Sequence, residues 1–204
     1  MAIITLPTNF SFTSVSRFGL TRNSNVLRSK YTAVRQVLVF PYAIWEFEGT
    51  LVEYDGANAN AVRSFLVQLE GVQNKFKLPV PGYTKPTTGY ISVFSVNLSA
   101  AVGATSVSFA VGTASTAIFN DGDYFTINDE LKMVVGNAVS DGSAKVVVNF
   151  KPALRKAVTG ITPCQLLNPY CLMSAVDDDV ANWALKPPFR HGLKLKAIEA
   201  IELP

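Results

Sequence analysis

The sequence is poor in charge and in the residue types that most often perform catalysis. Charged residues make up 16% of its 204 residues and His191 is the single histidine, against about 25% charged residues in an average soluble domain. It contains no Gly-x-Ser-x-Gly, Walker A or His-Glu-x-x-His motif, so no local signal supports hydrolase, nucleotide-binding or zinc-protease chemistry. We interpret His191, just before the last predicted strand, as a turn or surface residue. We therefore expect no enzyme and no catalytic residues.

Long apolar runs and a recognisable signal peptide are also lacking. Residues 1–20 contain neither a charged start nor a continuous apolar segment, so they do not read as a signal peptide. The uninterrupted apolar runs are only a few residues long, which excludes a transmembrane helix and predicts no membrane insertion by this chain.

A strong charge of one sign is missing as well. The net charge of +3, from 18 basic and 15 acidic residues, is too small for an electrostatic footprint on nucleic acid. The N-terminal stretch has a mild basic excess, which we interpret as a solvated or subunit-facing surface because aromatic interleaving is absent. Its basic residues are Arg17, Arg22, Arg28, Lys30 and Arg35.

Candidate metal ligands are scarce. The acidic run Asp177, Asp178 and Asp179 supplies oxygen ligands for a hard cation, but it lacks the alternation, the glycine and the terminal glutamate of a calcium loop. A solvated loop is the preferred interpretation, and we expect no metal and no cofactor. Cys164 and Cys171 have no framework spacing, so two free, partly buried thiols are favoured, although a disulfide between them stays geometrically open.

What the sequence has in excess is apolar residues. Hydrophobic residues make up 49% of the chain and the mean hydropathy is +0.24. Either partner subunits cover part of this apolar surface, or small apolar residues line both faces of extensive β-sheets.

The first part of the chain predicts strands and one helix. Residues 1–30 have few regular periodicities, and we expect a mobile segment that orders against a neighbouring subunit. Residues 31–40 predict a strand that ends at Pro41, and residues 44–52 predict a second strand, with alternating apolar and polar positions. An apolar stripe at helical spacing predicts a helix over residues 58–70, stopped by Gly71. A short strand over residues 75–78 follows.

The middle of the chain has a different texture, with short strands rich in Val, Ser, Thr and Ala. Five strands, joined by turn residues, are predicted over residues 90–98, 106–111, 123–127, 131–139 and 144–150. This pattern fits a small β-barrel of the OB or a related Greek-key type. We expect the aromatic residues of this region to point mostly into its core. They are Tyr90, Phe94, Phe109, Phe119, Tyr124, Phe125 and Phe150.

A last strand is predicted over residues 192–203, where Leu195 and Ala197 alternate with lysines. Because final strands often pair with early ones, we expect the small barrel to be an insertion. The predicted fold is mainly β: a β-sandwich or barrel-like domain with one helix, formed by residues 1–84 and 166–204, and an inserted β-barrel over residues 85–165.

The order of these elements resembles the distal tail protein (Dit) family of long-tailed bacteriophages. The resemblance rests on residues 62–71 followed by Phe76, Leu78 and Pro79, and on residues 121–127, 132–135, 146–152 and 154–155 of the predicted barrel. It implies a structural protein of the phage tail tip or baseplate, part of the virion and made in the bacterial cytoplasm. It also implies a homohexameric ring between the tail tube protein and the baseplate hub protein, with side fibre or receptor-binding proteins nearby. DNA would pass through the ring without being read.

Other functions stay open at this level. The chain could be another tail tube or baseplate component, or a carbohydrate-binding module on the receptor side. Sugar binding would favour exposed aromatics on the barrel, but Trp45 and Trp183 both lie outside it. An enzyme would need a pocket with perturbed carboxylates around Asp177, Asp178 and Asp179.

Overall fold

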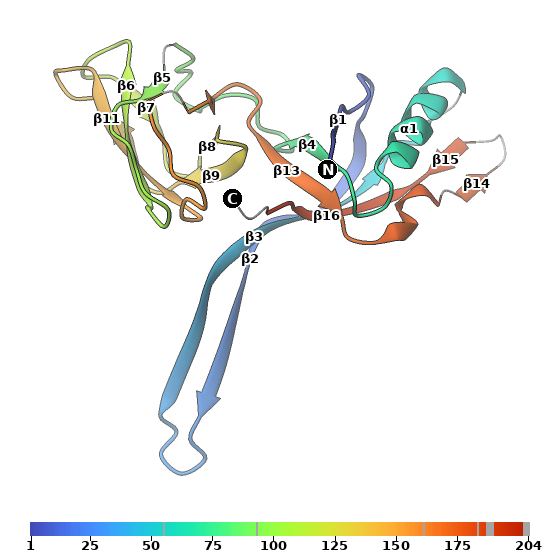
Figure 1. Cartoon of the computed structure of the whole chain (residues 1–204), viewed down its shortest axis with the longest axis horizontal. Helices are drawn as coiled ribbons and strands as arrows, with labels where there is room; N and C mark the ends of the chain where they lie inside the picture. Colours follow the sequence, from blue (N-terminus) through green and yellow to red (C-terminus); the bar gives the residue numbers. More distant parts are fainter. Residues whose placement is uncertain (55, 93, 161, 183, 187–189, 202–204) are drawn as a thin grey trace.

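The structure is a computed structural model that describes residues 1–54, 56–92, 94–160, 162–182, 184–186 and 190–201. Within these residues it contains two six-stranded sheets, two two-stranded ribbons, one α-helix and one short 3-10 helix. The predicted class, mainly β with one helix and a barrel-like sheet, is confirmed. Figure 1 shows two lobes side by side and a long hairpin that projects away from both.

The first lobe is built on a sheet that combines strands from both ends of the chain. Its last strand, β16, lies between β13 and β3, as expected for a final strand that returns to early ones. Leu195 and Ala197 of β16 are buried while Lys194 and Lys196 are exposed, which confirms the predicted alternation. In order across the sheet the strands are β1 (Ile3–Ile4), β4 (Lys75–Pro79), β13 (Tyr170–Ala175), β16 (Lys194–Glu199), β3 (Arg35–Leu51) and β2 (Phe12–Arg28).

The helix α1 (Gly56–Gln68) packs on this sheet. The helix was predicted over residues 58–70, so its existence and apolar face are confirmed and its bounds shift by two residues. Phe65 meets Phe76 of β4 edge to face, with ring centroids 5.6 Å apart. The helix stripe and the sheet thus share one apolar core, whose fully buried members include Phe47, Leu51, Leu66, Leu69, Phe76 and Leu78.

The second lobe is a nearly closed barrel sheet around a separate apolar core. Phe109, Phe119, Phe125 and Phe150 are buried in this core, as predicted. In order the strands are β12 (Cys164–Gln165), β8 (Tyr124–Ile127), β9 (Glu130–Val134), β11 (Lys145–Lys151), β6 (Ser106–Val111) and β5 (Phe94–Val96), with a small ribbon of β7 (Ala117–Phe119) and β10 (Ala138–Val139).

Several expectations about this lobe need correction. Residues 131–139 do not form one strand, because Gly136 adopts a positive φ of 82° and separates β9 from β10. The strand predicted over residues 90–98 shrinks to the three residues of β5. Tyr124 is only partly buried and packs against the first lobe's core, with its ring 6.0 Å from that of Trp45.

The N-terminal part of the chain is more regular than predicted. Residues 12–28 form the 17-residue strand β2, so the expectation of an irregular segment is wrong. The two strands predicted over residues 31–40 and 44–52 are one continuous strand, β3, that runs past Pro41. The ladder skips from Arg22 opposite Ala43 to Ser24 opposite Val39. Pro41 falls in this irregularity, where a missing N–H costs no ladder hydrogen bond.

The remaining elements lie near the C-terminal end. The short 3-10 helix η1 (Asp178–Ala181) follows β13, and a two-stranded ribbon is formed by β14 (Ala184–Lys186) and β15 (Arg190–Gly192). His191 was predicted as a turn or surface residue. Its backbone pairs with Leu185 in this ribbon, which contradicts the turn, and the surface position stays a prediction. In the part of the chain that the structure describes, no helix has the length and apolarity needed to cross a membrane.

Candidate assembly surface

The long hairpin of β2 and β3 is the main unpaired surface of the molecule. β16 pairs with β3 only between Ile198 opposite Glu46 and Lys194 opposite Thr50. From Arg22 to Ala43 the hairpin has, among the described residues, no third strand on either side. We call residues 22–43 the arm. Its ladder from Arg22 to Arg28 alone spans roughly 20 Å, and Figure 1 shows it standing clear of both lobes.

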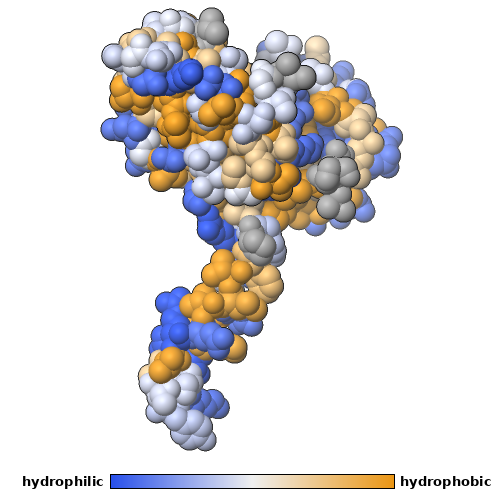
Figure 2. Space-filling model, turned by 60° about the vertical axis from the view of Figure 1, so that its left-hand side comes forward, coloured by the Kyte–Doolittle hydropathy of each residue, from blue (hydrophilic) through white to orange (hydrophobic). Residues whose placement is uncertain are grey.

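The arm exposes apolar side chains on both faces. The cross-strand pairs place Val26 opposite Val37 on one face, which also carries Val39. The other face carries Leu27 and Leu38. All five are between 41% and 60% exposed, and Figure 2 shows hydrophobic atoms over much of the arm's length.

Such a structure is unfavourable in isolation. A two-stranded hairpin in water is marginally stable at best. A long edge strand with apolar side chains offers unpaired N–H and C=O groups to any other chain. Contiguous exposed apolar surfaces are typical of sites that contact another protein, a membrane or a ligand. The arm therefore has the properties of a segment that is covered in a larger assembly.

The tip of the arm is ordered by its own hydrogen bonds. The backbone N–H of Ser29 donates to the carbonyl of Val34 at 3.0 Å. The hydroxyl oxygen of Ser29 accepts from the N–H groups of Tyr31 and Thr32 at 3.3 and 3.2 Å. The side chain of Tyr31 is fully exposed. The tip is thus a shaped turn that presents an aromatic ring to solvent.

The charge of the arm is of one sign. Residues 1–45 contain no aspartate or glutamate. Arg22, Arg28, Lys30 and Arg35 are exposed, and none forms an ion pair within the described residues. Arg28 lies directly opposite Arg35 in the ladder, and like charges in such a cross-strand pair destabilise a hairpin.

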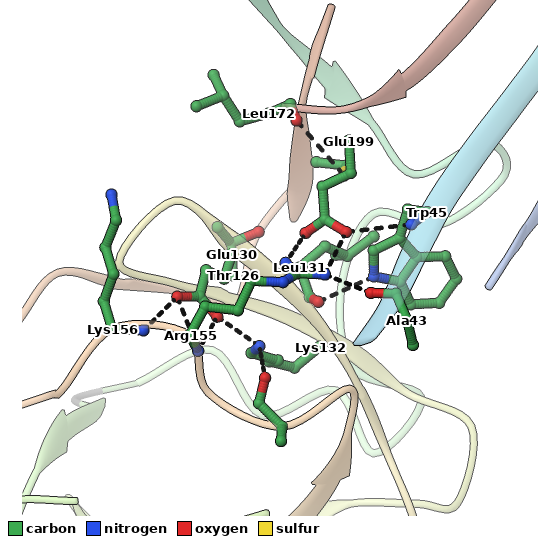
Figure 3. A network of polar contacts seen from close by, with 12 residues as sticks. Ala43, Trp45, Thr126, Glu130, Leu131, Lys132, Arg155, Lys156, Leu172 and Glu199 are labelled. Atoms are coloured by element: carbon green, nitrogen blue, oxygen red, sulfur yellow. Dashed lines mark hydrogen bonds and ion pairs between the residues drawn. The ribbon is translucent and has the colours of Figure 1, made fainter. Parts of the chain in front are cut away.

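A buried polar network holds the root of the arm between the two lobes (Figure 3). The carboxylate of Glu199, on β16, forms an ion pair with the guanidinium of Arg155. Arg155 comes from the chain after β11 and also donates to the carbonyl of Ala43, the last residue of the arm. Glu199 accepts the backbone N–H of Trp45 at 3.1 Å. One arginine therefore joins the barrel lobe, the first sheet and the arm.

The indole of Trp45 adds a second connection between the lobes. Its Nε1–H donates to the carbonyl of Leu131 on β9 at 3.0 Å. Trp45 is 2% exposed and stacks on Phe18, with ring centroids 5.4 Å apart. This contact fixes the strand from which the arm emerges against the barrel.

A buried lysine–glutamate pair completes the network. Lys132 is 0% exposed and donates from Nζ to Glu130 at 2.6 Å and to the carbonyl of Ala153 at 2.9 Å. Glu130 also accepts the backbone N–H groups of Arg155 and Lys156. Burial lowers the pKa of Lys132, while the Glu130 carboxylate acts in the opposite direction. The hydrogen-bond partners of Lys132 and Glu130 are groups of the protein itself, and they include two in the loop that carries Arg155. The pair therefore positions this loop.

Few side chains of the types that perform catalysis lie together among the described residues. Among the described residues no group of three or more His, Cys, Asp or Glu side chains could hold a metal ion. Asp177, Asp178 and Asp179 are exposed, and Asp178 accepts the N–H of Val72. A hollow of about 170 Å³ beside them is also lined by Lys194 and Lys196.

The thiols are equally unsuited to nucleophilic chemistry. Cys164 and Cys171 are both free. Burial raises the pKa of each thiol above its ordinary value, which keeps both in the unreactive protonated form. The side chain of His191 and all of Trp183 lie outside the described parts of the structure, so their predicted roles stay predictions.

The barrel carries an open groove of about 520 Å³ between β5, β6, β10 and β11. Its residues are Asn97, Leu98, Ser108, Asn137, Ala138, Val139, Asp141, Lys145 and Val147. These side chains are amides, a hydroxyl, aliphatics, one carboxylate and one ammonium group. Sugar sites generally present aromatic faces, and this lining has none.

Sequence reasoning found the basic residues of the arm but not the arm itself. Two features of the sequence could have indicated the arm. The first 45 positions contain no acidic residue, and apolar residues lie on both sides of residues 29–34. The network residues were missed entirely, since Glu130, Arg155 and Glu199 share no motif. The sequence matches no model of a known protein family, and no curated protein matches it.

Proposed function

We propose that this chain is a structural protein of a bacteriophage tail tip and that its copies form a ring. The resemblance to the Dit family implies six copies in this ring. The ring would connect the tail tube to the baseplate hub and leave a channel through which DNA passes. The observation that supports this proposal best is the arm: a long, acid-free hairpin with two open edges and apolar residues on both faces. Such a segment needs a protein partner more than it needs a ligand.

Two further features agree with an assembly role. The two apolar cores are separate, and the arm contributes to neither. The arm's root is held by the Arg155–Glu199 ion pair and by Trp45, so the arm has a fixed direction with respect to both lobes. A fixed direction is what a repeated contact around a closed ring requires.

The test is the mass of the purified protein in solution by light scattering over a range of concentrations. We expect about six times 22.1 kDa, stable on dilution. A strictly monomeric protein at every concentration would contradict a self-assembling ring.

The matched variant lacks only the arm. Arg22 and Ala43 are directly opposed in the ladder, so replacing residues 23–42 by Asn-Gly closes the hairpin with a two-residue turn. We expect this variant to melt as a folded protein and to be monomeric. An arm-less protein that still forms the full ring would show that other surfaces carry the assembly.

The groove on the barrel supports a weaker second candidate, a carbohydrate-binding module on the receptor side. Asn97 and Asn137 in this groove can hydrogen-bond sugar hydroxyls. Their side chains are already engaged, with Ser108 and with the N–H of Asp121 respectively. We therefore rank sugar binding second, and a glycan screen on a monomeric protein would be its test.

A further inference from the structure

The arm tip contains a repulsion that its own chain does not relieve. Arg28 and Arg35 face each other across the ladder at its last pair, and Lys30 follows in the turn. No carboxylate within the described residues pairs with any of the three. Two guanidinium groups held side by side are destabilised unless an anionic group bridges them. This points to an anionic partner at the tip.

The side chains below this pair identify the partner as a protein. The face that carries the Arg28–Arg35 pair also carries Val26, Val37 and Val39 in successive rows. These valines are 41% to 58% exposed. An apolar row that leads to a pair of cations suits a partner surface with apolar groups and carboxylates. A nucleic acid, by contrast, would be held by cations and stacking rings along the whole path.

Among the described residues, a cluster of exposed carboxylates lies where α1 ends and η1 begins. Asp177, Asp178 and Asp179 form the turn before and within η1, and Glu70 is exposed where α1 ends. Asp178 ties the two together through the N–H of Val72. Lys194 and Lys196 lie beside Asp177 and Asp179, which leaves four carboxylates against two ammonium groups. We call Glu70 and residues 177–179 the acidic turn.

Within one molecule the arm and the acidic turn are apart. The arm is the part of β2 and β3 that extends beyond the first sheet, whereas η1 contacts α1 of the first lobe. Val180 of the acidic turn's helix is partly buried against the lobe's apolar core. The two complementary surfaces can therefore meet only between different copies of the chain.

We propose that the arm of one copy docks on the acidic turn of the next, with Arg28 and Arg35 bound to the carboxylates of Asp177 and Asp179. This inference rests on the self-assembly part of the proposed function and adds the partner surface. Because the two surfaces differ, the contact is heterologous, and its repetition closes a ring or extends a filament.

The experiment uses charge reversal in the full-length protein. R28E/R35E keeps two like charges opposite each other on the arm but makes them negative. D177K/D179K makes the charges at positions 177 and 179 of the acidic turn positive. We expect each to weaken self-association on the order of 100-fold, measured by light scattering on dilution. The variant that combines all four substitutions should recover association. The control K85E/K151E changes two exposed lysines of the barrel side by the same charge, and we expect it to associate as the unaltered protein does.

Three results would overturn the inference, and they separate it from the proposed function. If the arm-less variant is monomeric but D177K/D179K associates normally, the arm docks elsewhere and the ring proposal survives. If R28E/R35E leaves association unchanged but weakens binding of a labelled DNA duplex, the partner is a nucleic acid. If the unaltered protein never associates, both proposals are wrong. Circular dichroism of each variant confirms that it is folded.

Discussion

At the scale of single residues, the most consequential side chain is Arg155. It ties the carboxylate of Glu199 to the carbonyl of Ala43, two groups from different parts of the chain. Glu199 is 6% exposed, so its charge is stabilised by its protein partners and hardly by water. Breaking a buried ion pair leaves an uncompensated charge, which costs far more than losing an exposed pair.

Replacing Arg155 by alanine should therefore lower the free energy of unfolding by about 3–5 kcal/mol, measured by urea denaturation. The matched control is Arg17→Ala, since Arg17 pairs with Glu46 at 2.8 Å with over half of its side chain exposed. We expect that control to cost about 0–1 kcal/mol. Equal losses in both variants would mean that Glu199 is solvated and that the network does not hold the lobes together.

At the scale of elements, the end of α1 shows how a glycine joins two segments. Gly71 has a positive φ of 65°, and a Cβ placed there would lie 3.0 Å from the backbone Cα of Asp178. The backbone conformation favours glycine, and so does the close approach of the acidic turn. The helix ends at Gln68, three residues before the predicted stop, and Glu70 already adopts a positive φ of 49°. Gly71 therefore lies in the turn after the helix and makes room for η1, which the sequence did not indicate.

We expect Gly71→Ala to lower the free energy of unfolding more than Gly82→Ala does. Gly82 has a similar φ of 71° but nothing within 4 Å of its added Cβ, so it reports the backbone strain alone, about 1–2 kcal/mol. Thermal or urea unfolding of both variants measures the difference. The same loss at both positions would show that the contact with Asp178 gives way without cost.

At the scale of the whole molecule, the arm stands apart from both apolar cores. Its residues fill neither core, and its edges are open, so its persistence in solution depends on what covers it. If the arm docks between copies, the arm should become more protected from proteases as more copies associate.

Trypsin cleavage tests this link. Arg28, Lys30 and Arg35 are exposed at the tip, so we expect the dilute, dissociated protein to be cut there first. At concentrations where light scattering shows the ring, cleavage at these sites should be slower, because the arm is then covered. A small peptide substrate must be cut at the same rate in both samples. Unchanged cleavage of the arm in the ring would mean that the arm stays free.

The local elements of this protein could be predicted from sequence wherever one periodicity extended over a whole element. The stripe of Val62, Phe65, Leu66 and Leu69 predicted α1, and the alternation after Gly192 predicted β16. Both patterns reflect the burial of one face, which local spacing reports directly. The barrel aromatics were predicted inward for the same reason. The prediction failed for Tyr124 because it precedes the inward Phe125 on β8 and so lies on the opposite face, which packs against the first lobe's core.

The arm could not be predicted in this way, because neither of its faces is buried by its own chain. Without burial the two-residue period loses its apolar–polar contrast, and Pro41 suggested an end where the strand continues past a ladder irregularity. The sequence by itself determined the mainly β class, the helix, the returning strand and the one-sided charge of the first 45 residues. The tertiary structure alone decided that Glu130, Arg155 and Glu199 meet at the arm's root, since residues so far apart in sequence are brought together only by the packing of the two lobes.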